Sequence, residues 1–314
     1  MQRKTASLED PAPAPADMHA FVRAVELGTL SAAARERDVP ASQVSRAIDR
    51  LEAAYGVRLL RRSTHGLSVT PEGEILLGHA RQILGSLTDL SAEFESRSGS
   101  PSGVVRMSVS EIMADAQVLP SLAALAQRHP QLRVDLHADD RLIDLATEGF
   151  DLAIRTSVVD NDNLVARRIG EYRRAVYASP GFLHEFGAPR HPEDLARMRC
   201  VTHASRGQLN RWGFLIDGRR TQIAVNGHHR SNNTALAAKM VREGLGVGRL
   251  NSAAVCDWVS RGELVPVLTE YQDPTLFPIY AVMLPERRRL PRVRAVVEHL
   301  AGVFGPRRKQ KDMR

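Results

Sequence analysis

The stretch from residue 29 to residue 48 constrains this chain most, because its pattern predicts two short helices joined by a turn. Small or apolar residues on one side of the stretch predict a packed interior: Ala32, Ala33, Val39, Val44, Ile48 and Leu51. The other faces of the second helix carry mainly polar side chains: Ser42, Gln43, Ser45, Arg46, Asp49 and Arg50. Hydroxyl, amide and guanidinium groups suit phosphates and base edges. The stretch therefore predicts a helical module that lies on DNA.

The flanking sequence predicts three helices and a hairpin around this module. The expected helices cover residues 17–27, 32–37 and 41–55, with Ser31 as the N-cap of the second and Gly56 as the stop of the third. Segments 57–60 and 67–69 would pair as a hairpin that exposes four basic residues: Arg58, Arg61, Arg62 and His65. Beside a DNA-binding helix we favour phosphate contacts for this basic wing, and a solvated charge run is the alternative.

A long helix is expected over residues 71–97, beginning at a proline that suits a first turn. Its apolar residues are spaced 4, 3, 4, 3, 4, as in a coiled-coil seam: Leu76, Ala80, Ile83, Leu87, Leu90 and Phe94. A rod of roughly 40 Å exceeds what a small winged domain covers. We therefore expect the same helix of a second subunit as its partner; packing on this chain's own second domain is the alternative.

A Ser/Gly/Pro-rich hinge at 98–103 separates this part from a region where strands alternate with helices. The expected elements are strands at 104–109, 132–137 and 151–155, and helices at 119–127 and 141–147. This alternation predicts an α/β domain with a largely parallel sheet, whose ligands sit beyond the carboxyl ends of the strands.

Composition narrows the class of protein without identifying it. The chain has 314 residues, of which 43% are hydrophobic and 25% charged, and this balance predicts about two globular domains. A formal charge of +7 permits a polyanionic partner. We expect no disulfide or zinc site from Cys200 and Cys256, no membrane span, and no signal peptide in residues 1–17, hence a cytoplasmic protein. A flexible leader is expected at 1–16 and a basic tail at 306–314.

Residues 18–305 resemble the LysR-type transcriptional regulators. The resemblance rests on these segments: FVRAVELGTLSAAARERDV, VSRAIDRLEAAYGVRLLRRS, SVTPEG, HPQLRVDLH, EGFDLAIR and GLGVGRL. It implies an α/β protein overall, with a mainly α winged helix-turn-helix at 17–70, a linker helix at 71–97, and an effector domain at 104–305. That domain would resemble type 2 periplasmic binding proteins, with one lobe from 103–172 and 272–305 and the other from 173–271.

The resemblance also implies functional residues. The expected DNA contacts are Ser31, Ser42, Gln43, Ser45, Arg46, Arg50, Arg58, Arg61 and Arg62. Gln43 stands two positions away from the glutamine that often contacts DNA in the family, whereas Ser45 and Arg46 keep their register. The expected effector contacts are Ser110, Glu111, Asp139, Asp140, Arg155, Thr202, His203, Asn232 and Asn233. Dimers that pair into tetramers are the implied assembly, and RNA polymerase is a further candidate partner.

Two features bear on the effector. Glu111 and Asp139 place acidic groups at the rim of the expected cleft, which favours a neutral or partly cationic effector; pairing with Arg155 or Arg206, or exposure to solvent, is the alternative. The helix after Asn233 would point its amino end at the cleft, where free N–H groups favour anions.

Other candidate sites are weaker. The histidines at 184, 191, 228 and 229 lack nearby carboxylate or cysteine ligands at metal spacing, Cys200 fits a small core residue, and the glycines at 244–248 lie in the wrong order for a Rossmann turn. We expect a ligand-responsive transcription regulator without a cofactor. The alternative is a solute-binding or enzymatic α/β protein with an appended helical domain; the chain offers no nucleophile with an oriented base for it.

Overall fold

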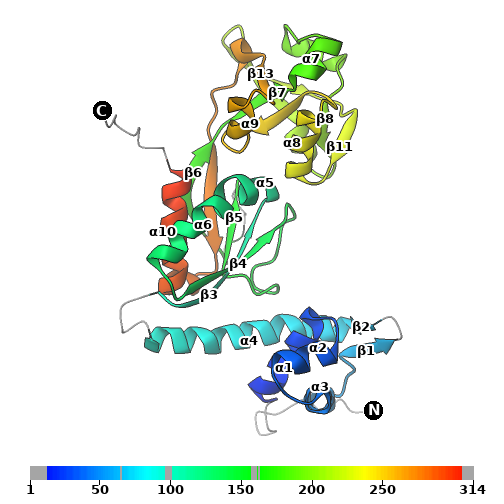
Figure 1. Ribbon diagram of the computed structural model, residues 1–314, viewed down its shortest axis with the longest axis vertical. Helices are drawn as coiled ribbons and strands as arrows, with labels where there is room; N and C mark the ends of the chain where they lie inside the picture. The colour runs from blue at the N-terminus through cyan, green and yellow to red at the C-terminus, as the bar shows by residue number, and fades with distance from the viewer. Residues whose placement is uncertain (1–12, 64–65, 96–100, 157–160, 162, 306–314) are drawn as a thin grey trace. The chain divides into compact units, whose positions relative to one another are not determined.

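The computed structural model describes residues 13–63, 66–95, 101–156, 161 and 163–305, and the chain divides into two compact units (Figure 1). The first contains residues up to 98 together with 143–150, and the second contains the remainder. The expected leader lies mostly outside the described residues, as do the basic tail, His65 and part of the hinge. The proposed domain boundaries therefore stay predictions.

The first unit begins with three helices packed on one core. They are α1 (Pro15–Glu26), α2 (Leu30–Glu36) and α3 (Ala41–Tyr55). The expected bounds of α3 are confirmed, and Gly56 ends it in the left-handed conformation with φ +67°. The N-cap prediction is wrong: Thr29 Oγ1 accepts a hydrogen bond from the Ala32 amide at 3.1 Å, while Ser31 lies inside the first turn. The helix therefore starts two residues earlier than expected.

A hairpin and a long helix complete the first unit. The antiparallel strands β1 (Leu60–Ser63) and β2 (Gly66–Val69) confirm the hairpin, although its first strand begins at residue 60 rather than 57. Helix α4 (Pro71–Glu95) follows.

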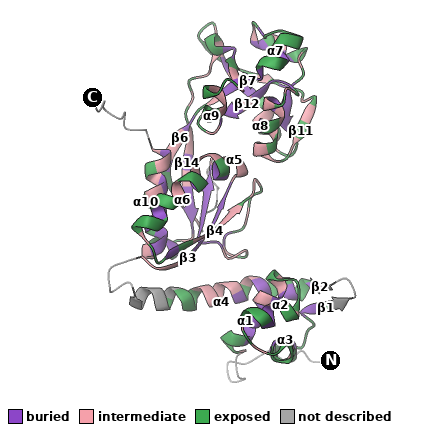
Figure 2. Ribbon diagram, in the orientation of Figure 1, coloured by how far each residue is buried: buried purple, intermediate pink, exposed green. Residues whose placement is uncertain are grey.

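The apolar seam of α4 divides into two parts (Figure 2). Leu76 and Ala80 are buried in the core of the first unit, so the expectation that they face a second subunit is wrong. Ile83, Leu87 and Leu90 are 42%, 44% and 52% exposed. The Phe94 side chain lies outside the described part.

The second unit has two lobes, each with its own sheet and core. The first lobe contains β3 (Gly103–Val109), α5 (Glu111–Met113), a π-helical turn (Ala114–Val118), α6 (Leu119–Arg128), β4 (Leu132–Ala138), β5 (Leu152–Arg155), β6 (Val165–Tyr172), β14 (Phe277–Met283) and α10 (Pro291–Phe304). Its strand order is β4-β3-β5-β14-β6. Strands β4, β3 and β5 are parallel, but β14 runs antiparallel to both neighbours, so the expected largely parallel sheet is a mixed one.

The second lobe follows directly on β6. It contains β7 (Arg174–Ala178), α7 (Pro180–Phe186), β8 (Val201–His203), β9 (Arg211–Ile216), β10 (Arg219–Ala224), β11 (His229–Ser231), α8 (Thr234–Arg242), β12 (Gly248–Asn251), α9 (Cys256–Ser260) and β13 (Val265–Val267). Strands β12, β7 and β13 form an antiparallel sheet, and a bridge between Cys200 and Val247 attaches β8 and β11 to its edge. Short 3-10 turns cover Pro192–Ala196, Gly207–Asn210, Thr269–Tyr271 and Arg287–Arg289.

One expected helix is absent from the described residues: 141–147 forms turns instead. The Asp144 carboxylate accepts hydrogen bonds from the amides of Ala146 and Thr147 at 2.9 and 3.3 Å. Such local bonds compete with helical ones and favour a turn. The other expected elements, 104–109, 119–127, 132–137 and 151–155, are confirmed to within one residue at each end.

Candidate DNA-binding face and ligand cleft

The outer face of α3 presents the residues expected to contact DNA. Ser42, Gln43, Arg46 and Arg50 are exposed, and Ser45 is half-buried. Gln43, Arg46 and Arg50 share a groove of about 340 Å³ with Arg37, which sequence reasoning missed. Arg37 follows α2 directly, and no periodic signal marks it. The face thus combines hydroxyl, amide and guanidinium groups on one rigid helix.

Two contacts hold arginines of this face in place. Arg50 donates to the Asp17 carboxylate at 2.5 and 2.9 Å, and Asp17 itself is only 7% exposed. Arg46 Nε donates to the Ser42 carbonyl at 3.2 Å. The Arg50 guanidinium therefore joins α3 to α1 as well as facing outward, whereas the Arg46 bond stays within α3.

Glu52 fixes the start of the wing. Its Oε1 accepts hydrogen bonds from the Leu59 and Leu60 amides at 2.9 and 3.4 Å, and its Oε2 accepts one from Arg58 at 2.6 Å. Burial alone would raise the pKa of Glu52, but these hydrogen bonds outweigh it and lower that pKa. Arg58 remains 82% exposed beside Glu52, Arg61 is exposed, and the Arg62 side chain lies outside the described part.

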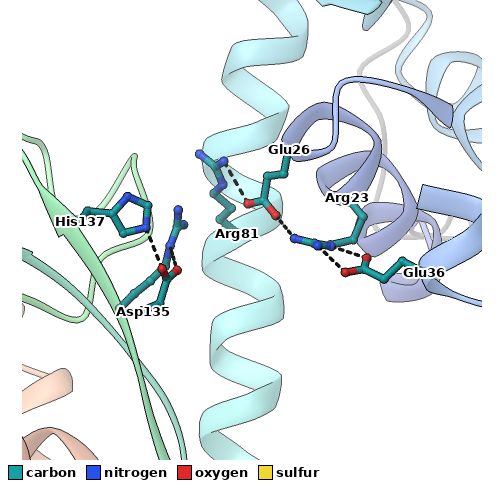
Figure 3. Close-up of polar contacts among 7 residues, drawn as sticks. Arg23, Glu26, Glu36, Arg81, Asp135 and His137 are labelled. Atoms are coloured by element: carbon teal, nitrogen blue, oxygen red, sulfur yellow. Dashed lines mark hydrogen bonds and ion pairs between the residues drawn. The ribbon is translucent and has the colours of Figure 1, made fainter. Parts of the chain in front are cut away.

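A separate charged network joins the helices away from α3 (Figure 3). Arg23 on α1 pairs with Glu26 and, through two nitrogens, with Glu36 on α2. Arg81 on α4 donates to Glu26 at 3.1 Å. The bond to Glu36 is the main reason that the pKa of Arg23 is raised. These arginines are thus paired with carboxylates inside the first unit.

The second unit contains a cleft at the junction of its lobes, formed by two adjoining cavities. The inner one has a volume of about 110 Å³ and the outer one about 950 Å³. Both are lined by Thr156, Tyr172, Arg174, Arg206, Leu209 and Arg249. The two linings together contain five arginines and two aspartates, Asp140 and Asp273. The cleft is therefore cationic, contrary to the acidic rim expected from the sequence.

Four of the expected effector residues line the inner cavity: Ser110, Asp140, Thr202 and His203. The other five do not line either cavity: Glu111, Asp139, Arg155, Asn232 and Asn233. Three of these five residues have a partner elsewhere in the chain. Asp139 pairs with Arg141 at 2.8 Å, Arg155 donates to Ser108, and Asn233 caps α8 by accepting from the Leu236 amide at 2.8 Å.

The amino end of α8 already has an anionic partner. The Asp140 carboxylate, which follows β4 of the first lobe, accepts from the Thr234 amide at 2.5 Å and from Thr234 Oγ1 at 3.1 Å. Arg206 donates to the Asp140 carbonyl. A carboxylate of the chain thus lies at this helix end, where an effector anion was expected, and the Thr234 amide is not free for a ligand.

His203 and Thr202 are buried at the base of the cleft. His203 Nδ1 accepts from the Ser205 and Arg206 amides at 3.2 and 3.1 Å, and burial lowers the His203 pKa. A Cβ atom at Gly227 would lie 1.8 Å from Thr202 Oγ1, so this hydroxyl packs against the glycine backbone. His203 thus positions the loop that carries Arg206.

The remaining expectations from the sequence concern Cys200, a metal site and a membrane span. Cys200 is fully buried, and burial raises its pKa to about 12. Among the described residues, no three His, Cys, Asp or Glu side chains gather as metal ligands. None of the described helices is both long and apolar enough to cross a membrane.

Comparison with known proteins connects both sites to one family. Residues 15–74 match the bacterial regulatory helix-turn-helix of the LysR family, and residues 98–305 match the LysR substrate binding domain. The chain is 31% identical to the HTH-type transcriptional regulator PtxR of Pseudomonas aeruginosa over 289 residues, which cover 92% of each chain. It is 28% identical to a probable HTH-type regulator, LtrA, of Klebsiella pneumoniae, over 91% of this chain and 93% of that one.

A solved structure agrees with this assignment. CrgA, a LysR-type transcriptional regulator from Neisseria meningitidis, superposes with a TM-score of 0.63 at 29% identity and covers 96% of this chain and 100% of its own. The helix-turn-helix, the long α4 and the two-lobed α/β unit follow one another in the order of that family. The chain belongs to the LysR family of transcriptional regulators, with an N-terminal DNA-binding domain and a C-terminal effector-binding domain.

Proposed function

We propose that this protein binds promoter DNA as a dimer, through α3 and the wing of each subunit, and that a small molecule in the lobe cleft controls this binding. The observation that carries the proposal is the outer face of α3, where Ser42, Gln43 and Arg46 are exposed above a buried Val44 and Ile48. A 15-residue helix is about 22 Å long and fits the major groove.

The individual contacts divide by type. Ser42, Gln43, Ser45 and Arg46 lie on the side of α3 suited to base edges and nearby phosphates. The residues assigned to the sugar–phosphate backbone are Ser31, Arg50, Arg58, Arg61 and Arg62, to which we add Arg37. Because backbone contacts release counterions, affinity should fall steeply as salt rises.

The first test is binding to duplex DNA from upstream of the protein's own gene, followed by fluorescence anisotropy over a salt series. We expect tight binding to a two-fold site, and a linear fall of log K with log salt. Equal affinity for a scrambled duplex at every salt concentration would contradict sequence-specific regulation through this face.

Arg46→Ala should weaken specific binding by about 1–3 kcal/mol if the guanidinium reaches a base edge. Anisotropy with specific and scrambled duplexes measures the difference. Arg133→Ala removes the same charge from an exposed position on β4 of the second unit and should leave both affinities unchanged. An equal loss on both duplexes would assign Arg46 to the backbone alone.

The dimer contact proposed for α4 is now limited to its second half. Ile83 and Leu90 are exposed at coiled-coil spacing, and with Leu87 they continue the seam beyond the buried Leu76 and Ala80. Ile83→Glu should move the protein from dimer toward monomer in sedimentation at micromolar concentration. Thr88→Glu adds the same charge at an exposed position off the seam and should leave the dimer intact. An unchanged Ile83→Glu dimer would argue against this seam.

We further propose that the dimers pair into tetramers and that the protein contacts RNA polymerase. We also propose that it works in the cytoplasm, where promoter DNA lies. The cleft is proposed to sense its ligand and not to convert it, in line with the regulators that the chain resembles.

A further inference from the structure

Two arginines meet where the lobes join, and both lie close to one aromatic ring. Arg174 lies on β7 and Arg249 on the neighbouring β12, on the same face of the sheet, because Arg174 pairs with Asn251 and Val176 with Arg249. The Arg174 and Arg249 guanidinium carbons lie 5.3 and 5.6 Å from the centre of the Phe277 ring. Both residues line both cavities of the cleft.

Neither arginine forms an ion pair with an acid of the described chain. Among the described residues, the Arg174 side chain donates to the Tyr172 hydroxyl alone, at 2.8 Å. The nearby Asp273 is held by Arg220 at 3.0 Å and by the Thr275 hydroxyl. Burial, together with repulsion from Arg174, lowers the pKa of Arg249 to about 10, although the charge of Asp273 acts in the opposite direction. The two arginines thus form a partly desolvated positive charge that Asp273 offsets only in part, and a bound anion would neutralise it further.

The other anion-binding feature of the cleft is occupied. Asp140 fills the amino end of α8 through Thr234, and its carbonyl also engages Arg206. A ligand anion is therefore directed away from the helix end and toward Arg174 and Arg249, which keep most of their donors available.

The inner cavity beside the arginines is small and mainly apolar. Ile112, Met113, Leu209, Trp212, Ala237 and Leu250 contribute its apolar walls. Its volume of about 110 Å³ is somewhat below that of a cavity of ~150 Å³ that holds benzene. The cavity alone therefore holds less than a whole ring. A ring seated in it would extend into the adjoining outer cavity, which also leaves room for a polar substituent.

We propose that the effector is a small organic carboxylate whose carboxylate group bridges Arg174 and Arg249 and whose apolar part enters the inner cavity. A planar carboxylate matches the fork of a guanidinium, and the flanking Phe277 ring keeps both forks in the same region. The inference rests on the proposed function, because it names the ligand class of the cleft that controls DNA binding.

Three isosteric probes test the charge preference on the full chain: benzoate, benzamide and benzamidine, which are anionic, neutral and cationic. Isothermal calorimetry and thermal shift should detect benzoate binding at least about tenfold tighter than that of the other two, as expected for a charge-assisted contact. Equal binding of the three, stronger binding of benzamidine, or no binding of benzoate at millimolar concentration would overturn the proposal. Displacement of benzoate by equimolar inorganic phosphate would overturn the carboxylate preference.

Two variants and a control locate the site. Arg174→Gln and Arg249→Gln should each weaken benzoate binding by about ten- to a hundredfold. Arg219→Gln removes the same charge from an exposed position on β10, outside both cavities, and should leave the affinity unchanged. Folding of the variants is checked by the melting temperature without ligand, which should not fall for Arg249→Gln because repulsion is removed. Benzoate affinity equal to the wild type in both variants would overturn the site.

Failure of this inference can be told apart from failure of the proposed function. Calorimetry reports the carboxylate site without DNA, and anisotropy reports DNA binding without any probe. DNA binding that responds to another ligand class while benzoate does not bind would refute only the inference. Arginine-dependent benzoate binding in a protein that binds no DNA specifically would refute only the proposed function.

Discussion

Arg23, Arg50 and Arg58 of the first unit and Arg249 of the second unit are held in opposite ways. In the first unit Arg23, Arg50 and Arg58 each pair with a carboxylate, and the bond to Glu36 raises the pKa of Arg23. In the second unit Arg249 is half-buried without such a partner, and burial lowers its pKa to about 10. The same side chain is a stabilising tie in one region and a source of repulsion in the other.

The difference matches what each region is proposed to bind. DNA presents a continuous row of phosphates, so the arginines near it gain from being oriented on a rigid helix and still exposed, as Arg50 and Arg58 are. A single small anion offers few contacts. Charges that are partly desolvated before it arrives make each contact with it stronger. An exposed arginine that a carboxylate orients, such as Arg50, can thus face a row of phosphates, whereas the half-buried Arg249, which has no ion pair, suits a small anion.

The largest expected change in stability concerns Glu52, the partner of Arg58 in the first unit. Glu52→Ala leaves the Leu59 and Leu60 amides without their acceptor and Arg58 without its partner, which should lower the free energy of unfolding of the first unit by about 2–4 kcal/mol. Urea denaturation of the full chain, followed by circular dichroism, measures it. Glu74→Ala, at an exposed position on α4, should change stability little. A Glu52→Ala loss as small as that of the control would show that the wing does not depend on this carboxylate.

The contrast between Arg23 and Arg249 predicts that replacing each by methionine changes the free energy of unfolding in opposite directions. Arg23→Met should lower the free energy of unfolding by about 1 kcal/mol, because Glu26 and Glu36 lose a shared partner in a partly exposed network. Arg249→Met should raise it by about 1–2 kcal/mol in the absence of ligand, because a half-buried charge that repels Arg174 and has no ion pair is removed.

Thermal and urea unfolding of the two variants side by side measure both changes. A third variant, Arg219→Met, tests whether loss of any exposed arginine has the effect seen at Arg249. Destabilisation by Arg249→Met would mean that its charge is compensated in the folded state, and the comparison between the two units would fail.

Local sequence signals predicted much of the first unit. The bounds of α3 follow from the spacing of Val44, Ile48 and Leu51 and from Gly56, which are all properties of one helix. The N-cap was misplaced because Thr29 and Ser31 are both good caps, and only the backbone geometry selects Thr29. The seam of α4 was correct in spacing, but spacing does not tell that Leu76 packs inside its own domain.

The cleft was predicted less well, because its composition depends on pairing between distant strands. Arg174 and Arg249 are far apart in the sequence and meet only through the antiparallel register of β7 with β12. Glu111 and Asp139 were visible as acids, yet the sequence does not show that Asp139 pairs with Arg141 or that Asp140 reaches α8. The direction of β14 likewise depends on its return from the second lobe. Long-range register is the information that local patterns lack.

The smallest predicted effect is on the pH dependence of stability and concerns His203, which lines the inner cavity. Burial, followed by the charge of Arg206, lowers its pKa below the ordinary value of 6.5. The unfolded chain therefore takes up the proton first as pH falls, so stability from neutral His203 is complete above pH 6.5 and is lost as pH falls through 6.5 toward the folded-state pKa. Protonation would also remove Nδ1 as the acceptor for the Ser205 and Arg206 amides.

His203→Asn should flatten this dependence, because the amide oxygen can still accept a hydrogen bond and does not titrate. Urea unfolding of the second unit between pH 7.5 and pH 5 compares the variant with the wild type, and His299→Asn serves as the matched control, since burial also lowers the His299 pKa. A larger change for His203→Asn than for His299→Asn would support a role of neutral His203 in holding the Ser205 and Arg206 amides. No change in the slope for His203→Asn would contradict it.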